Sequence, residues 1–239
     1  MFHVKHLYIE EMIKGVIFDY NGTLMFDLDC ALDAWHELYE LIMGTRDGFD
    51  DDIAKICFCL NTRTIIERIY EKANIKPTEE MIQEYSGMIG GFYQKSRLKR
   101  KMFTLATGAY DVVKYCKDQG YPVNMCTASR EKEVNFYFEH TDGLSELFDR
   151  KIVSFDDGIV QGKVSMYQEA CSRIVVKPEE TLVFEDSRPS IECAIQAGVK
   201  KIIYVNHFGR DKIEFPEIIQ EVYDFTEFDR SLLHKFDNE

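Results

Sequence analysis

Side chains that suit metal and phosphate chemistry stand directly after three apolar segments of this sequence. Asp19 follows the first segment and Thr127 follows the second. Glu185 and Asp186 follow the third. Carboxylate oxygens are the ligands that Mg²⁺ prefers, and a free carboxylate can attack phosphorus as a nucleophile. Together with a hydroxyl group that can hold a phosphoryl oxygen, these residue types indicate metal-assisted phosphoryl transfer.

A lysine adds positive charge to this set. Lys163 follows Gly162 near the predicted start of a helix, and its ammonium group would neutralise the oxygens of a phosphoryl group. Two structural alternatives stay open at this point. Thr127 could cap the helix that follows it, and Lys163 could be a solvated surface residue.

The segments around these residues predict a parallel sheet. Short strands are expected at residues 16–18, 123–126, 151–154, 181–184 and 201–205, and a last strand near 222–223 precedes a helix. Helical segments separate the strands beyond residue 108, which is the pattern of βαβ units. Ligands bind at the carboxyl ends of the strands in such sheets. The polar side chains named above are therefore expected at one edge.

Residues 29–101 follow a different pattern. Their apolar side chains repeat at helical spacing, and none of the segments alternates as a strand would. Asp29 and Thr78 stand where the N-caps of helices are expected. The chain therefore interrupts its α/β pattern with a helical insertion soon after the first strand.

The predicted fold class is α/β, with a Rossmann-like parallel sheet core and a helical cap inserted after the first strand. The core domain is expected to comprise residues 1–25 and 103–239. The cap domain is expected to comprise residues 26–102.

The composition narrows the classes of partner. The chain has 239 residues and a formal net charge of −13, which disfavours nucleic acid as a partner. No apolar segment reaches the length of a membrane span, and residues 1–12 lack the apolar region of a signal peptide. Seven irregularly spaced cysteines suit reduced thiols. We expect a cytoplasmic protein, a monomer or small homo-oligomer, with a small phosphorylated metabolite as its partner.

Four segments, in order, resemble the four motifs of the haloacid dehalogenase (HAD) superfamily. They are Val-Ile-Phe-Asp-Tyr-Asn-Gly-Thr-Leu at 16–24, Met-Cys-Thr-Ala-Ser at 125–129, Gly-Lys at 162–163 and Leu-Val-Phe-Glu-Asp-Ser at 182–187. The resemblance extends from residue 15 to residue 205. The position of the helical insertion resembles the small cap of the branch that includes β-phosphoglucomutase and phosphoglycolate phosphatase.

The resemblance implies a Mg²⁺-dependent phosphatase whose nucleophile is Asp19. This side chain would attack phosphorus and form an aspartyl-phosphate. The metal ligands would be the side chains of Asp19 and Asp186 and the backbone carbonyl of Asn21, with Glu185 in or near the coordination shell.

The resemblance also implies a phosphate-binding set. Thr127 and Lys163 would hold the phosphoryl oxygens, and the neighbouring backbone at Ala128 would line the same position. Gly22 would allow the tight turn after the first strand, and the backbone there would help to hold the phosphate.

Asn21 departs from the family pattern at a catalytic position. The family phosphatases usually have Asp here, which acts as a general acid and then as a general base. An Asn side chain cannot exchange a proton in this way. Three functions therefore stay open: a phosphatase, a phosphotransferase or mutase with a long-lived phosphoenzyme, and a non-catalytic phosphate-binding regulatory protein.

Nearby residues raise further hypotheses. Asp27 or Asp29 could reach the site and replace the missing acid, although a loop charge and a helix N-cap are the ordinary alternatives. Arg63 could meet an anionic substrate or lie on a helix surface. The basic run at 95–101 is expected as a solvated helix end that interacts favourably with the helix dipole, with added positive potential near the cleft as the alternative.

Overall fold

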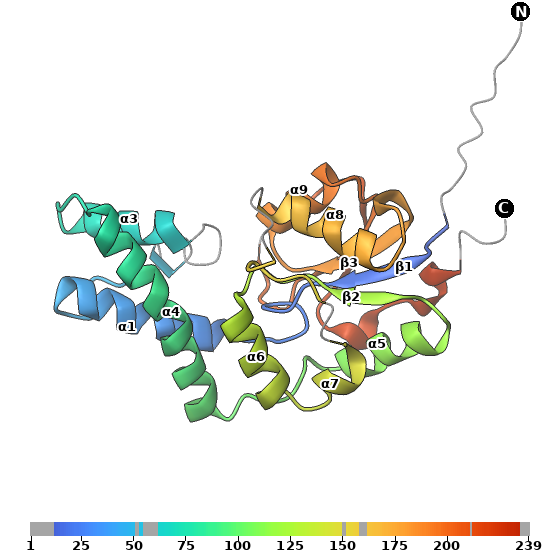
Figure 1. The fold of residues 1–239 in the computed structure, drawn as a ribbon, viewed down its shortest axis with the longest axis horizontal. Helices are drawn as coiled ribbons and strands as arrows, with labels where there is room; N and C mark the ends of the chain where they lie inside the picture. Colours follow the sequence, from blue (N-terminus) through green and yellow to red (C-terminus); the bar gives the residue numbers. More distant parts are fainter. Residues whose placement is uncertain are drawn as a thin grey trace, which may run out of the picture.

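The computed structural model describes residues 12–50, 53–54, 62–149, 152–157, 162–210 and 212–234. They form a sheet covered by helices on both faces, with a second group of helices beside it (Figure 1). None of the described helices is long and apolar enough to cross a membrane. The start of the chain, up to residue 11, lies outside the described part.

Five parallel strands form the sheet. They are β1 (Gly15–Phe18), β2 (Val123–Met125), β3 (Thr181–Glu185), β4 (Lys201–Val205) and β5 (Ile218–Val222). Their order across the sheet is β2-β1-β3-β4-β5. β1 therefore lies between β2 and β3, and the carboxyl ends of all three meet at one edge. The predicted α/β fold with a parallel sheet is confirmed.

Helices cover both faces of the sheet, which explains why β1, β3 and β4 are buried throughout and mainly apolar. The pair α8 (Lys163–Arg173) and α9 (Arg188–Gln196) packs on one face, and α5 (Ala109–Asp118) packs on the other (Figure 1). The remaining elements are α6 (Glu131–His140), α7 (Leu144–Leu147), η1 (Pro178–Glu180), η2 (Phe225–Glu227) and η3 (Arg230–Leu233).

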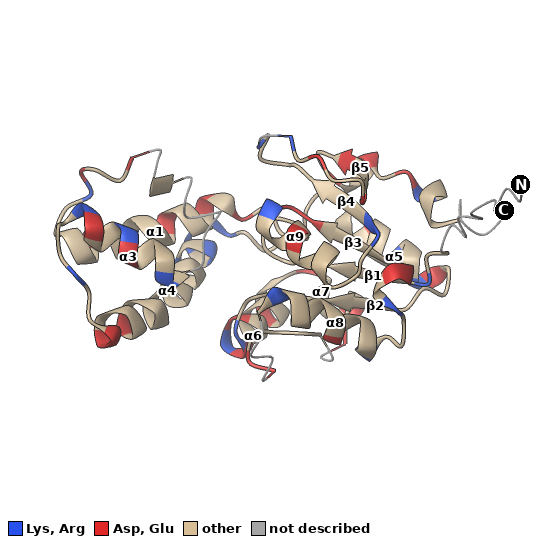
Figure 2. Cartoon of the chain, turned by 90° about the horizontal axis from the view of Figure 1, so that it is seen from above, with Lys and Arg blue, Asp and Glu red and all other residues tan. Residues whose placement is uncertain are grey.

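The second group of helices consists of α1 (Leu28–Met43), α3 (Thr62–Lys72) and α4 (Glu79–Arg100). Their facing apolar side chains form a core of their own that includes Trp35, Leu38 and Ile66. Lys and Arg lie among Asp and Glu on these helices as they do on the α/β part (Figure 2). The helical insertion lies beside the sheet, and the limits given above for the two domains stay a prediction.

Several local expectations were wrong. Among the described residues, 152–154 form only an isolated bridge between Val153 and Cys126, because the chain turns at once and the Ser154 amide donates to the Asp157 side chain. The helix predicted to start after Asp29 begins at Leu28. The expected C-terminal helix is replaced by the two short 3-10 helices η2 and η3. Thr78 does cap α4, accepting a hydrogen bond from the next turn.

One basic residue of the run at 95–101 is buried, so its interpretation as a solvated helix end was wrong at Arg97. The Arg97 side chain is fully buried. Its guanidinium donates to the Met102 carbonyl at 2.8 and 3.1 Å, to the Tyr20 hydroxyl at 3.1 Å and to the Thr141 hydroxyl at 3.1 Å. A buried cation requires such partners. Arg97 thus links the end of α4 to the residues that follow β1 and α6.

We expect Arg97→Met to reduce the free energy of unfolding by about 2–4 kcal/mol, because it leaves the Met102 carbonyl without its two donors. Lys99→Met, on the exposed side of the same helix, is the control and should change it by less than about 0.5 kcal/mol. Urea unfolding followed by the fluorescence of Trp35 and by circular dichroism measures both. Equal effects of the two substitutions would contradict this role.

Candidate active site

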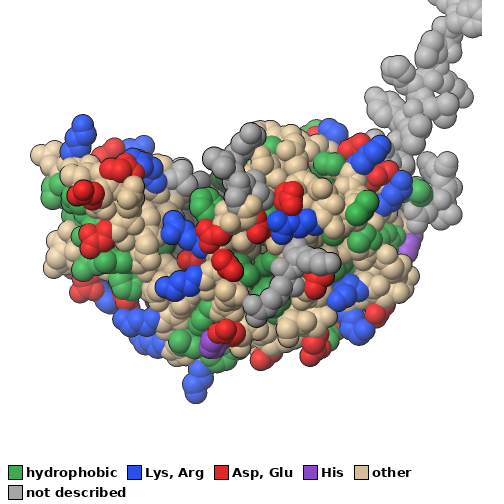
Figure 3. All heavy atoms as spheres, in the orientation of Figure 1, with side chains coloured by type: hydrophobic (Ala, Val, Ile, Leu, Met, Phe, Trp, Pro, Cys, Tyr) green, Lys and Arg blue, Asp and Glu red, His purple; other side chains and the backbone are tan. Residues whose placement is uncertain are grey.

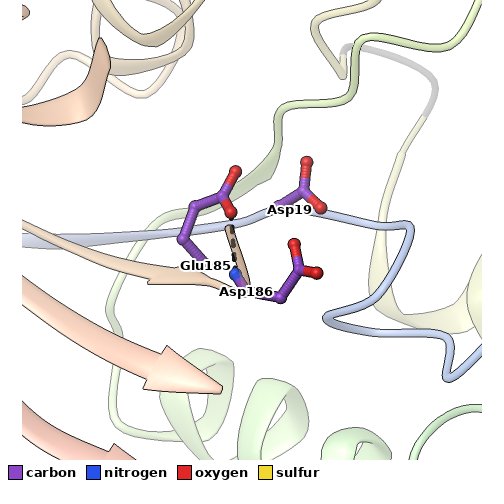
Figure 4. Close-up of side chains that lie close together, drawn as sticks. All are labelled: Asp19, Glu185 and Asp186. Carbon is purple, nitrogen blue, oxygen red and sulfur yellow. Dashed lines mark hydrogen bonds between the residues drawn. The ribbon is translucent and has the colours of Figure 1, made fainter. Parts of the chain in front are cut away.

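Three carboxylates gather where β1 and β3 end (Figure 4). Asp19, Glu185 and Asp186 each offer one oxygen, and these oxygens lie within 4.8 Å of one another. All three side chains are buried. The pairing of β1 with β3 fixes this approach, since the Asp19 amide continues the ladder by donating to the Phe184 carbonyl. Buried like charges at this separation need a cation to neutralise them.

Lys163 supplies one such cation from the first turn of α8. Its Nζ lies 2.8 Å from Asp19 Oδ1, 2.5 Å from Glu185 Oε1 and 2.9 Å from Ser190 Oγ. The side chain is only 15% exposed. The alternative of a solvated surface lysine was therefore wrong, and the sequence-based grouping of Lys163 with the carboxylates agrees with the structure.

Glu185 is held from all sides. Lys163 and the Tyr167 hydroxyl donate to Oε1, and the backbone amides of Asp186 and Ser187 donate to Oε2. Burial alone would raise the pKa of Glu185, but the attraction of Lys163 and these hydrogen bonds outweigh it and lower the pKa. Glu185 is therefore ionised and holds the Lys163 ammonium in place.

The other two carboxyl groups respond differently to burial. Burial raises the pKa of Asp19 to about 7, with Lys163 opposing the shift and Glu185 adding to it. Burial and then the charge of Glu185 raise the pKa of Asp186 well above its ordinary value. Burial disfavours the charged form of both groups, and a small, hard divalent cation bound between their oxygens would favour it. The donor set thus fits Mg²⁺, with Asp19 and Asp186 as the side chains that would hold it.

Gly22 lies where a side chain has no room. Its φ is +81°, and a Cβ at this position would come within 2.3 Å of Asp186 Oδ2. Glycine therefore permits both the turn after β1 and the close approach of Asp186. This position was picked out correctly from the sequence for its turn, while the contact with Asp186 was not foreseen.

The loop after β2 lies against the same cavity. Thr127, Ala128 and Ser129 line it together with Asp19 and Lys163. Thr127 is buried, and its Oγ1 accepts a hydrogen bond from the Ser129 amide at 3.2 Å. The N-cap of α6 is Arg130, so the alternative that Thr127 caps this helix was wrong.

The cavity has a volume of about 650 Å³, and both parts of the molecule line it. The α/β part contributes the polar groups described above. The helical insertion contributes mainly apolar side chains, which include Ala31, Trp35 and Ile65. In the space-filling view the outline is hollowed between the two parts, with charged side chains of both signs nearby (Figure 3).

Two arginines on the cavity wall differ in their partners. Arg63 lines the cavity, but its guanidinium is paired with Glu79 at 2.7 and 2.8 Å and with Glu67 at 3.0 Å. The Arg130 guanidinium faces the Phe155 ring at 5.9 Å, and no carboxylate of the described residues forms an ion pair with it. Arg130 is therefore the more available of the two for an anionic substrate.

Comparison with known proteins agrees with this geometry. The family model described as haloacid dehalogenase-like hydrolase matches residues 13–198, which includes all the motif residues. The chain belongs to the haloacid dehalogenase-like hydrolase family. The predicted resemblance and the prediction of a hydrolase are confirmed by this match.

One curated relative resembles this HAD chain in sequence, and two solved structures share its fold over nearly its whole length. The phosphorylated carbohydrates phosphatase of Thermotoga maritima is 23% identical over 201 residues, which cover 83% of this chain and 88% of that protein. A family IA, variant 3 HAD hydrolase from Entamoeba histolytica has a TM-score of 0.80 at 24% identity, covering 95% and 100% of the two chains. CbbY from Rhodobacter sphaeroides, in complex with xylulose-(1,5)bisphosphate, has a TM-score of 0.74 at 21% identity, covering 90% and 96%.

Asn21 of this HAD protein belongs to a hydrogen-bond network that the sequence did not reveal. Its Nδ2 donates to Asp27 Oδ2 at 2.6 Å, and its Oδ1 accepts from Ser129 Oγ at 3.0 Å. The Tyr137 hydroxyl lies 3.4 Å from both of these Asn21 atoms. The Asn21 amide is thereby fixed with its nitrogen toward Asp27.

Asp27 reaches the site and Asp29 does not. The buried Asp27 carboxylate lines the cavity and accepts hydrogen bonds from Asn21, from the Gly22 amide and from the hydroxyl of Tyr93 on α4. Burial raises its pKa. Asp29 forms an exposed ion pair with Arg100. Of the two candidates, only Asp27 is placed to interact with Asn21 or a substrate.

Three residues in contact with the carboxylates and Lys163 were missed from the sequence. Tyr167 and Ser190 hold Glu185 and Lys163, and Arg210 donates to Asp186. The spacing of Tyr167, one helical turn after Lys163, could have indicated a shared helix face. Ser190 has no such signal, because only the packing of α9 beside α8 brings it to Lys163.

We expect Asn21→Asp to reduce the free energy of unfolding by about 1–3 kcal/mol in metal-free buffer at pH 7, because it puts a second carboxyl group 2.6 Å from Asp27. The exchange Asn21→Asp with Asp27→Asn restores one carboxyl and one amide and should recover most of this loss. Urea unfolding of both single variants and the double variant measures the coupling. Simple additivity of the two single effects would show that the pair does not interact.

Proposed function

We propose that this protein is a Mg²⁺-dependent phosphatase that acts on a small phosphorylated metabolite through an aspartyl-phosphate on Asp19. The observation that carries the proposal is the buried Asp19 carboxylate beside Lys163 and Asp186, at the base of a cavity of about 650 Å³. Bound Mg²⁺ would neutralise the oxygens of the phosphoryl group and of Asp19. The naming of the Thermotoga maritima relative as a phosphorylated carbohydrates phosphatase supports a sugar phosphate as the substrate class.

The chain's own residues would carry the two chemical steps. In the first, an Asp19 oxygen forms a bond to phosphorus as the ester P–O bond breaks, and the electron pair leaves with the alcohol oxygen, which takes a proton from solvent. In the second, a water oxygen attacks phosphorus and gives up a proton to solvent, while the bond between phosphorus and Asp19 breaks and restores the carboxylate. Lys163, Thr127 and the amides near Gly22 would hold the phosphoryl oxygens through both steps.

The apolar wall of the helical insertion would exclude water and select the substrate. Ala31, Trp35 and Ile65 face the cavity opposite the polar residues. Arg130 stands on the wall without a carboxylate partner among the described residues and would attract a further anionic or polar group of the substrate. The proposed partner is therefore small, carries one phosphate at Asp19, and has a less polar portion toward the insertion.

Asn21 supports a second candidate, a phosphotransferase with a long-lived phosphoenzyme. The Asn21 amide is held by Asp27 and Ser129 and offers no proton to the leaving alcohol or from the attacking water. The first step with a good leaving group needs little acid, whereas hydrolysis of the aspartyl-phosphate would be slow. Another acceptor could then take the phosphoryl group.

We expect the purified protein to release p-nitrophenol from p-nitrophenyl phosphate in a reaction that requires Mg²⁺ and stops with EDTA. Asp19→Asn should reduce this release on the order of 10⁴-fold, since it removes the nucleophile. Asp118→Asn, in an exposed pair with Lys114, is the control and should leave the rate unchanged.

The time course separates the candidates. Continuous release with Mg²⁺ supports the phosphatase, and a burst of one product per enzyme that then stalls supports the phosphotransferase. A third outcome is that the unsubstituted protein releases neither p-nitrophenol nor the alcohol of any of a set of sugar phosphates, at enzyme concentrations that would show one turnover. That result would contradict both the phosphatase and the phosphotransferase, and the phosphate-binding regulatory protein would be the remaining candidate.

We expect Asp27→Asn to slow turnover by about 10²-fold or more and Asp29→Asn to leave it unchanged. Asp27 is the carboxylate that fixes the Asn21 amide and the Gly22 amide, while Asp29 lies on the surface with Arg100. Steady-state rates and the burst amplitude measure the two effects separately. Equal rates for both variants would rule out a contribution of Asp27.

A further inference from the structure

Arg210 brings a second cation to the carboxylate cluster from the loop after β4. Its Nη1 lies 2.8 Å from Asp186 Oδ2 and 3.1 Å from the Asp186 carbonyl. The residue lines the same cavity as Asp19 and Lys163. The Arg210 guanidinium is therefore in contact with the carboxylate that would hold a metal, at the wall of the cavity that would hold a substrate.

Hydrogen bonds with Asn206 hold the backbone of Arg210 in place. The Arg210 amide donates to Asn206 Oδ1 at 2.8 Å, and Asn206 Nδ2 donates to the Arg210 carbonyl at 3.1 Å. The guanidinium also lies 5.2 Å from the centre of the Phe208 ring. These contacts fix the backbone of Arg210 beside the cavity, and its side chain is 26% exposed.

The charges of the cluster change sign when a divalent cation binds. Asp19, Glu185 and Asp186 contribute −3 when ionised, and Lys163 and Arg210 contribute +2, which gives −1. A bound divalent cation brings the sum to +1, and a phosphate dianion returns it to −1. Without Arg210 the three sums would be −2, 0 and −2. Arg210 thus makes the cluster less attractive to a metal and more attractive to an anion once the metal is present.

We propose that Arg210 is a further phosphate-binding residue, which pairs with Asp186 in the empty site and turns to the phosphoryl group once a divalent cation occupies Asp186. The proposal rests on the proposed function, because it takes Asp186 as a metal ligand. Its consequence is coupling: the metal releases Arg210 for the anion, and the anion draws Arg210 away from Asp186. By thermodynamic linkage each ligand then tightens the binding of the other.

The test is calorimetric titration of the whole protein with Mg²⁺ alone, and with inorganic phosphate at saturating Mg²⁺. Compared with the unsubstituted protein, Arg210→Gln should bind Mg²⁺ about fivefold more tightly and bind phosphate at least about fivefold more weakly. Arg210→Lys keeps the charge and should lie between the two. Lys212→Gln, two residues away and paired with Glu214 on the surface, is the charge-matched control and should change neither affinity.

The outcomes separate this inference from the proposed function. Weaker Mg²⁺ binding in Arg210→Gln would show that Arg210 merely positions Asp186, and unchanged phosphate affinity would show that it does not reach the anion. Either result overturns the inference alone. Failure of the unsubstituted protein to bind Mg²⁺ would overturn the metal role of Asp186, and with it both proposals. Circular dichroism of each variant confirms that it is folded.

Discussion

The site depends on one ammonium group that compensates buried carboxylates. Asp19 and Glu185 are withdrawn from water and would repel each other without Lys163, whose Nζ lies within 2.8 Å of both. The three residues come from β1, β3 and α8, which are far apart in sequence. Only a sheet in which β1 pairs with β3, with α8 packed across it, can bring them together. The charge cluster thus depends on the topology of the sheet and on the packing of α8.

A second constraint follows from the pair formed by Asn21 and Asp27. One amide and one carboxylate share a short hydrogen bond here, and Tyr93 of α4 donates to the same carboxylate. Two carboxylates at this distance would repel each other unless one held a proton. Asn at position 21 is therefore matched to its surroundings, and the helical insertion is part of that match through Tyr93. The family's usual Asp at this position would disturb an arrangement that is already complete.

The sequence predicted the site residues that follow strands and tight turns, and it missed most of the side-chain contacts that depend on helix packing. Asp19, Gly22 and Asp186 were found because each follows a strand or a tight turn, and such places are visible in a few neighbouring residues. The interaction of Asp27 with Tyr93 joins residues 66 positions apart, and the burial of Arg97 requires the end of α4 to meet Tyr20 and Thr141. No local pattern carries that information. The basic run therefore resembled a solvated helix end.

The cavity divides its tasks between the two parts of the molecule. The polar residues that would bind a phosphate follow the ends of strands or, for Lys163, stand at the start of α8. The helical insertion contributes an apolar wall. Substitutions of these apolar side chains would change the shape of the cavity without altering the positions of the carboxylates. Asp27, at the N-cap of α1, and Tyr93 of α4 are the exception, because they form hydrogen bonds with Gly22 and Asn21 in the turn after β1. A movement of the insertion away from this turn would break these hydrogen bonds, so the position of the insertion is coupled to that of the Asn21 side chain.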